Sequence, residues 1–409
     1  MTAPTSSEVS ENEHVEPFGV SYTLADLTRY FLKLGSLGFG GPVALVGYMH
    51  RDLVERRQWI SEADYKEGLA LAQLAPGPLA AQLAIYLGYV HYRILGATLI
   101  GVAFVAPSFA MVVALGWAYQ HYGGLSWMQA VFYSVGSCVI GIITYGAYKL
   151  TKKTIGHDWL LWPIFLASAV CTVITETEYV AMFLLAGVLV WLIKSPPKFG
   201  RGSPGAAASF LLPLAIWPAL ELSKEAQTRL DIVLFFIKAG AFVFGSGLAI
   251  VPFLYSGVVN EFHWLDDHTF LDAVAVAMIT PGPVVITVGF IGYLVDGFTG
   301  ASLAAIATFL PCYLFTIIPA PYFKKYGRRP GIVNFVDGVT AAAIGAIGGA
   351  VIVLARRSIL DDVGQPHWPK VLILLATLGL LASGKKIPEP LVVLAAALVG
   401  LLIFPYVTH

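Results

Sequence analysis

Long apolar stretches separated by short polar ones run along almost the whole chain. A membrane-spanning helix needs roughly 20 apolar residues. The hydrophobic pattern predicts ten such segments, at about 24–50, 95–120, 126–148, 158–175, 178–194, 230–257, 298–322, 332–355, 367–383 and 387–406. Two more helices, at about 61–93 and 266–296, are interrupted by Pro-Gly-Pro. We therefore expect an all-α polytopic membrane protein with roughly 10 to 13 membrane segments.

The two halves of the chain are copies of each other. Phe31, Lys33, Gly35, Phe39 and Gly40 recur 205 residues later as Phe236, Lys238, Gly240, Phe244 and Gly245. The same offset aligns Trp59 with Trp264, and Pro76-Gly77-Pro78 with Pro281-Gly282-Pro283. Apolar segments broken by Gly and Pro at corresponding positions of two halves indicate the binding site of a transporter.

The repeat divides the chain into four parts. Residues 1–22 are polar and acidic and are predicted to be a disordered tail. Residues 23–194 form the first repeat and 230–409 the second. Between them, 195–229 is a linker that contains a short apolar segment at about 208–222.

The distribution of Lys and Arg predicts that the two repeats have opposite orientations in the membrane. Loops rich in cations face the cytoplasm. Those loops contain Lys149/Lys152/Lys153, Lys194/Lys198/Arg201, Lys324/Lys325/Arg328/Arg329 and Lys385/Lys386. Alternation from these points inverts one repeat against the other and places the C-terminus outside. The basic loop 51–57 and its repeat partner 256–262, which has no cation, then lie on opposite faces.

Each Pro-Gly-Pro helix either crosses the membrane or turns back as a re-entrant hairpin. If both cross, 208–222 also crosses, which gives thirteen spans and a cytoplasmic N-terminus. If both turn back, ten spans suffice and the N-terminus lies outside. The basic loop 51–57 favours the hairpin, whereas the absence of an export signal on the polar tail favours crossing. We take crossing as the prediction.

The first candidate binding motif is a glycine-rich break in the first helix of each repeat. It reads Leu37-Gly38-Phe39-Gly40-Gly41-Pro42 in one half and Phe242-Val243-Phe244-Gly245-Ser246-Gly247 in the other. Such backbone cannot hold a regular helix, and lipid does not tolerate its unpaired polar groups. It must therefore face protein or a wet cavity, with close helix packing through small residues as the alternative.

The second motif comprises Pro76, Gly77 and Pro78 with Pro281, Gly282 and Pro283. Proline disfavours helix at the preceding residue and suits the first turn of a new helix. Each motif thus ends one half-helix and starts another, and Ser61 and Asp266 are the expected N-caps of the preceding halves. A helix N-terminus attracts anions. Free N–H groups are expected at Gly77, Leu79, Ala80, Gly282, Val284 and Val285. A proline kink without a ligand is the alternative.

A third set of candidates consists of polar residues inside apolar segments. Lys33 and Lys238 are repeat-equivalent, and a lysine in the membrane is either functional or extends its charge to the surface. Asp337 either carries protons or caps the helix that follows it. Neutral donors for an oxyanion are Gln82, Ser246, Thr280 and Thr287, each of which is otherwise a helix-packing residue.

Composition narrows the function classes. Hydrophobic residues make up 57% of the chain and charged ones 12%, with a formal net charge of +0, so we expect a lipid bilayer and no nucleic acid as partner. The three cysteines stand apart within apolar stretches. There is no phosphate loop, nucleophile triad or cluster of metal ligands, so we expect no enzyme, no metal, no cofactor and no ATP drive.

Several motifs together resemble the chromate ion transporter (CHR) family, in its long two-domain type. They are Phe31-Leu-Lys-Leu-Gly35, Phe39-Gly-Gly-Pro42, His50, Leu53-Val-Glu-Arg-Arg57, Trp59-Ile-Ser-Glu62 and Pro76-Gly-Pro78. Two positions depart from the family pattern: Gly38 stands where Ser is frequent, and Leu79 where some relatives have Glu.

The resemblance implies a secondary transporter in the inner membrane of a prokaryotic cell. It would export chromate from the cytoplasm, confer chromate resistance and use the membrane potential or an ion gradient. Sulfate, an isostere of chromate, would compete. The alternatives are uptake or exchange of sulfate or a related dianion, and an intramembrane enzyme or lipid scramblase built on re-entrant hairpins. A homodimer is a possible assembly.

Overall fold

The structure, a computed structural model, is helical throughout its described parts. It describes residues 22–39, 41–122, 126–177, 179–196, 223–243, 247, 250–326, 329–359, 365–383 and 387–407. The first repeat contains α1 (Leu24–Leu37), α2 (Gly41–Met49), η1 (His50–Arg56), α3 (Glu62–Leu74), α4 (Leu79–Tyr122), α5 (Ser126–Thr154), α6 (Leu161–Thr175) and α7 (Val180–Lys194). The second contains α8 (Lys224–Ala241), α9 (Ile250–Tyr255), η3 (Ser256–Glu261), α10 (Asp267–Ile279), η4 (Val284–Ile286), α11 (Thr287–Ile317), α12 (Ala320–Tyr326), α13 (Pro330–Ile359), α14 (Trp368–Ala382) and α15 (Glu389–Val407). The predicted segment 208–222 and most of the predicted tail lie outside the described residues.

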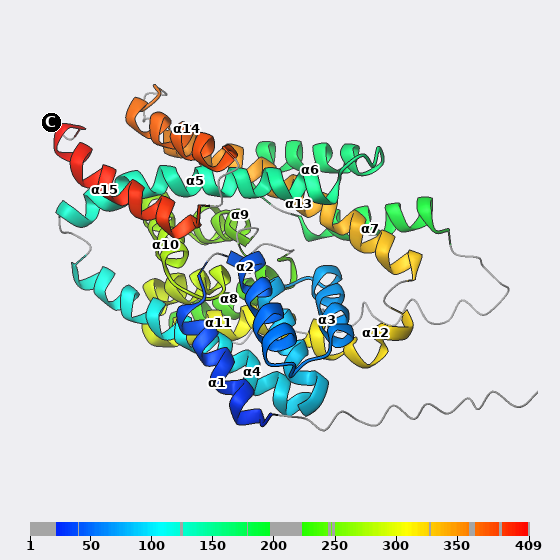
Figure 1. Ribbon diagram of the computed structural model, residues 1–409. Coiled ribbons are helices and arrows are strands. Elements are labelled where there is room, and N and C mark those ends of the chain that lie inside the picture. Colours follow the sequence, from blue (N-terminus) through cyan, green and yellow to red (C-terminus); the bar gives the residue numbers. More distant parts are fainter. Residues whose placement is uncertain are drawn as a thin grey trace, which may run out of the picture.

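The helices form two layers (Figure 1). One layer contains α1, α4, α8 and α11, and the other contains α5, α6, α7, α13, α14 and α15. Within the described residues, four helical stretches are long and apolar enough to cross a membrane: Leu79–Tyr122, Trp127–Thr154, Val284–Phe323 and Pro330–Ile359. The all-α membrane fold expected from the hydrophobic pattern is confirmed.

The glycine-rich break turns the first apolar segment back on itself. Helix α1 ends at Leu37 and α2 begins at Gly41, which has a φ of +74°. The ring of Trp59, after η1, stacks on the ring of Tyr22, before α1, with centroids 4.9 Å apart. The prediction that 24–50 crosses the membrane once is therefore wrong, because the residues that flank this segment meet.

Pro-Gly-Pro also reverses the chain. An added Cβ on Gly68 in α3 would lie 2.3 Å from the ring of Tyr86 in α4, so the two arms pack side by side. In a continuous helix these residues would be about 27 Å apart. The prediction that this broken helix continues across the membrane is wrong, because it turns back as a hairpin. The outside N-terminus that accompanied the hairpin alternative does not follow, since the segment 24–50 also turns back. The predicted caps are confirmed, since Ser61 and Asp266 accept hydrogen bonds from the backbone N–H groups of Asp64 and Thr269.

A second reversal occurs inside α4 and inside α11. Arg93 in α4 has a non-helical φ of 52°, and Gly297 in α11 has a φ of +55°. Two glycines flank each reversal and bring the two backbones into contact. An added Cβ on Gly88 would lie only 2.5 Å from the carbonyl oxygen of Gly96. Gly292 and Gly300 approach each other in the same way. Small residues thus let each half-helix pack directly against the long helix that follows it.

The two repeats run in opposite directions. Helices α4 and α11 are antiparallel, since Thr98 hydrogen-bonds Tyr313 at 2.7 Å and Phe109 packs against Phe298. In each repeat the first helix lies parallel to the long one, with Gly35 against Phe104 and Gly240 against Thr308. The predicted inverted repeats are confirmed. The open ends of the hairpins define two faces, which we name the Trp59 face (Tyr22, Trp59, His91) and the Trp264 face (Arg229, Trp264, Asp296).

The outer layer exchanges helices between the repeats. Helices α6 and α7 of the first repeat pack on α13 of the second, where Ser168 donates to the Ala342 carbonyl at 2.6 Å. Helices α14 and α15 of the second repeat pack on α5 of the first. Each repeat therefore buries its last two helices against the other, so the halves are intertwined.

Candidate anion site at the junction of the hairpin turns

Backbone hydrogen bonds join the turns of the two repeats at the centre of the molecule. The N–H of Gly77 donates to the carbonyl oxygen of Val243 at 2.6 Å. The N–H of Gly282 donates to the carbonyl oxygen of Gly38 at 2.9 Å. Gly282 and Val243 are the repeat partners of Gly77 and Gly38, so the two bonds are related by the pseudo-twofold symmetry. Each Pro-Gly-Pro turn is held by the glycine-rich turn of the other repeat.

Glycine is required at the centre of both Pro-Gly-Pro turns. Gly77 has a φ of +143° and Gly282 a φ of +96°, a region that residues with a side chain rarely adopt. A Cβ on Gly282 would lie 1.9 Å from Oγ of Ser108, and one on Gly77 would lie 2.6 Å from Nε2 of Gln82. The buried Ser108 hydroxyl donates to the carbonyl oxygen of Pro281 at 2.8 Å. The turns are thus packed to atomic contact.

The beginnings of three helical segments face one small cavity between these turns. Pro42 lies at the start of α2, Pro78 precedes α4, and Pro283 precedes η4 and α11. The volume of the cavity is about 10 Å³, which is room for about one water molecule. Its lining residues are Pro42, Leu45, Pro78, Ala80, Gly247, Gly282, Pro283, Val284 and Val285. The junction is therefore closed in this structure, with helix N-termini around it.

The backbone donors around this cavity differ in part from those that the sequence predicts. Gly77 and Gly282 are not free donors, because both N–H groups are bonded across the repeats. The N–H groups of Leu79, Ala80, Val284 and Val285 have no hydrogen-bond partner among the described residues. Four predicted donors remain, and Ala80, Val284 and Val285 line the cavity itself.

Gln82 is the polar side chain closest to the first Pro-Gly-Pro turn. It is fully buried, and its Nε2 donates to the carbonyl oxygen of Pro76 at 2.8 Å. Its Oε1 has no hydrogen-bond partner among the residues that the structure describes. A buried polar atom without a partner costs free energy, so Oε1 needs a water or a ligand hydrogen.

The hydroxyls of the second turn are bonded to their own backbone. Thr280, which directly precedes the turn, donates to the Val276 carbonyl, and Thr287 donates to the Val284 carbonyl at 2.7 Å. In this closed state neither hydroxyl proton is free for an anion. Gly40, Gly245 and Ser246 lie outside the described residues, whereas Gly41 is the first residue of α2.

The structure does not bring the two predicted lysines to the central cavity. Lys33 and Lys238 lie on exposed faces of α1 and α8. Nζ of Lys238 lies 5.5 Å from the centre of the Phe253 ring. With Tyr179 and Glu261, Lys238 lines a separate pocket of about 240 Å³ between the two repeats. If these lysines contact an anion, they do so along its path rather than at the junction.

Asp337 lies two turns inside α13, which starts at Pro330. Its interpretation as an N-terminal cap is therefore wrong. It is partly buried, and Lys194 and Asp158, which form an ion pair with each other, are charged groups near it. Asp337 thus lies next to the end of α7 and does not line the central cavity.

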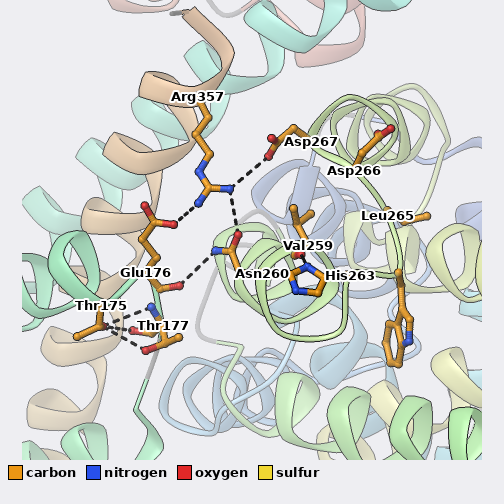
Figure 2. Close-up of a pocket in the computed structure, with 11 residues that line it drawn as sticks. Thr175, Glu176, Thr177, Val259, Asn260, His263, Leu265, Asp266, Asp267 and Arg357 are labelled. Carbon is orange, nitrogen blue, oxygen red and sulfur yellow. Dashed lines mark hydrogen bonds and ion pairs between the residues drawn. The ribbon is translucent and has the colours of Figure 1, made fainter. Parts of the chain in front are cut away.

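A pocket of about 700 Å³ opens at the Trp264 face (Figure 2). Figure 2 shows Arg357, from the end of α13, between Glu176, Asn260 and Asp267. Its guanidinium pairs with Glu176 and donates to Oδ1 of Asn260 at 3.1 Å. Asp266 also lines the pocket. Carboxylates outnumber this cation, so the pocket disfavours a dianion. The contacts of Arg357 instead connect α13 to residues of both repeats.

Sequence reasoning missed a buried acid, Asp272 in α10. Only 2% of its surface is exposed, and its Oδ2 accepts a hydrogen bond from the hydroxyl of Tyr119 at 2.7 Å. Nδ1 of His268 lies 3.2 Å from the same oxygen. The repeat contained the signal, because the offset of 205 residues aligns Asp272 with Glu67, an acid in α3. An acid therefore recurs at matching positions of both broken helices.

A family model described as "Chromate transporter" matches residues 25–191 and 230–401. The chain belongs to this family. It is 63% identical over 414 residues to the chromate transport protein of Cupriavidus metallidurans, with 99% of each chain covered. It is 62% identical over 392 residues to the probable chromate transport protein of Synechococcus elongatus, covering 95% of this chain and 97% of that one. The chromate transport protein of Pseudomonas aeruginosa is 29% identical over 420 residues, covering 98% and 97%. No solved structure matches the chain.

The family model matches two regions that coincide with the two inverted repeats. The relatives are named as transport proteins over nearly their whole length, so this chain is a transporter and not an enzyme. Within the described residues, no three His, Cys, Asp or Glu side chains gather in a way that could hold a metal ion.

Proposed function

We propose that this chain exports chromate from the cytoplasm through the junction of its four hairpin turns. The observation that carries the proposal is the convergence of helix N-termini on one cavity, in a chain closely related to chromate transport proteins. Helix N-termini favour anions because their N–H groups are unpaired and the helix dipole is positive there. A dianion would displace the single water for which the closed cavity has room.

Residues of both repeats would hold the anion together. Backbone N–H groups at Leu79, Ala80, Val284 and Val285 would donate to its oxygens. The Pro76, Pro78, Pro281 and Pro283 rings would leave these N–H groups free by preventing a continuous helix, and Gly41, Gly77 and Gly282 would let the backbone approach. Gln82, Thr280 and Thr287 would exchange internal hydrogen bonds for bonds to the anion as the junction opens. Gly40, Gly245 and Ser246 complete the proposed set.

Lys33 and Lys238 would attract the dianion toward the junction. Both lie on first helices of hairpins and are exposed, one in each repeat. An ammonium group near an anion path raises the local anion concentration through its field. We assign these lysines to the path and not to the closed junction.

The protein would be a multi-pass protein of the prokaryotic inner membrane, with the Trp59 face in the cytoplasm. Arg51, Arg56 and Arg57 lie at that face, which agrees with the preference of cations for the cytoplasmic side. An inside-negative potential favours the outward movement of a dianion by about 2.3 kcal/mol per charge per 100 mV. Efflux therefore needs no nucleotide hydrolysis, and it would confer chromate resistance.

The experiment is a flux assay with the purified full-length chain in liposomes. Chromate and sulfate are supplied separately, with and without an imposed membrane potential. Chromate flux that rises with a potential negative on the chromate side supports the proposal. Sulfate flux without chromate flux would replace chromate by sulfate as the substrate. Lipid flip-flop without any anion flux would reject the transport proposal and favour a scramblase.

A further inference from the structure

Asp272 is the only Asp, Glu, Lys or Arg that is buried in the described part of the chain, and it contacts His268 and Tyr119. Asp272 has 2% of its surface exposed, whereas the His268 side chain is 59% exposed. His268 lies one turn before Asp272 on α10, so the two side chains share a helix face. An exposed imidazole thus touches a buried carboxylate, which is the arrangement of a proton entry point.

The cluster also joins a hairpin of the second repeat to the long helix of the first. Tyr119 lies on α4 and donates its hydroxyl hydrogen to Oδ2 of Asp272. Asp272 is eight residues before Thr280, which is about 12 Å along a helix. Asp272 therefore lies at a contact between the two repeats, about 12 Å along α10 from the residue that precedes the second Pro-Gly-Pro turn.

The first repeat has an acid, Glu67, at the position that corresponds to Asp272. Glu67 on α3 contacts the hydroxyl of Tyr86. Glu67 belongs to the hairpin that opens at the Trp59 face, and Asp272 to the hairpin that opens at the Trp264 face. Each Pro-Gly-Pro hairpin therefore has an acid on its first arm that meets a tyrosine hydroxyl of α4, from its own second arm for Glu67 and from the other repeat for Asp272.

Other ionisable groups surround the cluster. The charge of Asp266, at the cap of α10, raises the pKa of His268. The charge of Lys370, at the start of α14, lowers it. Asp267 accepts a hydrogen bond from Tyr255 of α9. His263, after η3, lies 2.7 Å from the carbonyl oxygen of its own backbone neighbour Val259. Helices α5, α11 and α15 also pack against α10 and contribute apolar residues to the same buried core.

We propose that Asp272 is the site at which a proton from the Trp264 face binds and is coupled to the movement of the oxyanion. The inference rests on the proposed anion transport. It assigns proton coupling to Asp272 in place of Asp337. The partner ion is thus a proton, with His268 as its entry residue and Tyr119 as the residue that senses the bound proton.

The proton transfer is balanced within the cluster. The His268 imidazolium passes the proton on Nδ1 to Oδ2 of Asp272, which leaves a neutral imidazole and a neutral carboxyl group. His268 then takes a proton from water at the Trp264 face. Tyr119 donates to Oδ2 when Asp272 is ionised, and this hydrogen bond weakens once the atom carries a proton, because a neutral carboxyl oxygen is a weaker acceptor than a carboxylate oxygen. The weaker bond changes the contact between α4 and α10.

The test uses the full-length chain in liposomes that contain a pH-sensitive dye. Chromate flux and proton flux are recorded together across a range of pH. We expect Asp272→Asn to abolish the anion-dependent proton flux and to flatten the pH profile of chromate flux, while chromate still moves down its gradient. Asp272→Glu should restore proton coupling. Tyr119→Phe removes a donor to the ionised carboxylate, so it should shift the pH profile to higher pH.

The matched control is His263→Gln, which removes an imidazole from the same face without a carboxylate partner. It should leave coupling and pH profile unchanged. An Asp272→Asn protein with the wild-type ratio of protons to anions would overturn the inference, as would loss of coupling in Asp337→Asn alone. Wild-type chromate flux without any proton flux would also overturn it. Absence of chromate flux in the wild type would instead reject the proposed function, which keeps the two failures distinct.

Discussion

Gly77 and Val243, 166 positions apart in the sequence, are joined by a 2.6 Å hydrogen bond from backbone N–H to backbone carbonyl. The bond links the Pro-Gly-Pro turn of one repeat to the glycine-rich turn of the other. Its symmetry partner, from Gly282 to Gly38, closes the junction from the opposite side. Because backbone atoms make both bonds, side-chain changes can weaken the junction only by displacing the turns.

Replacing Gly282 by Ala should displace the second turn. The added methyl group would lie 1.9 Å from Oγ of Ser108, and the residue would keep a positive φ. We expect a loss of about 1–3 kcal/mol in the free energy of unfolding and a marked loss of chromate flux. Thermal unfolding in detergent and liposome flux measure the two effects.

The control for this change is Gly47→Ala in α2, where an added Cβ has nothing within 4 Å. That variant should keep its stability and its flux. If Gly282→Ala behaved like the control, the turn would not be as closely packed as described, and the junction would lose its role in transport.

Replacing Gln82 by Leu should reduce chromate flux. It should lower the free energy of unfolding less than Gly282→Ala does. The change removes the hydrogen bond to the Pro76 carbonyl, worth about 1 kcal/mol, and the unpaired Oε1 beside the turn. Initial rates at several chromate concentrations separate binding from turnover. Gln73→Leu on the exposed side of α3 is the matched control. Equal rates in the two variants would exclude Gln82 from the anion path.

Lys33→Ala and Lys238→Ala should each lower chromate flux while the protein still inserts. Because both lysines are exposed, we expect their effect to act through the field along the anion path and to weaken at high ionic strength. Flux at low and high salt measures this. Lys238→Arg keeps the charge and should retain most of the activity. Full activity in the double alanine variant would remove both lysines from the path.

The ionisation of His268 should depend on Asp272. The hydrogen bond from His268 to the Asp272 carboxylate raises the pKa of the imidazole above its usual value, against the opposing effect of burial. The stabilisation from this pair is complete below about pH 6.5, the ordinary histidine pKa, and is lost as the pH rises through the raised pKa. NMR of labelled histidine should show a lower His268 pKa in Asp272→Asn. An unchanged pKa would disprove the pairing.

Sequence patterns predicted the helical fold, the repeat and its inversion, because hydrophobic length and loop charge depend on local composition. They failed for the segment 24–50, where apolar length suggested one crossing. The stacking of Trp59 on Tyr22, which reveals the reversal, is a contact between distant residues. The Pro-Gly-Pro helices were ambiguous because proline is compatible with both a kink and a turn. Only the contact between the two arms decides between them.

The candidate site was partly predictable. The Pro-Gly-Pro residues do lie at helix starts, and Gln82 does approach the turn. The occupation of the Gly77 and Gly282 N–H groups could not be predicted, because their acceptors belong to the other repeat. Asp272 was predictable in principle from its alignment with Glu67. Asp272 and Glu67 each follow other charged residues at the start of a broken helix, so neither stands out as a lone charge in an apolar segment.

The crossed glycine bonds have a consequence for how such a chain could originate. In a polypeptide with only one repeat, the glycine N–H of the Pro-Gly-Pro turn would lack its acceptor. The carbonyl of the glycine-rich turn would lack its donor. Such a polypeptide could complete both by meeting a second copy inserted upside down in the same membrane. Fusion of two such units supplies the inverted copy in fixed proportion and lets the halves diverge, as Pro42 and Gly247 have done.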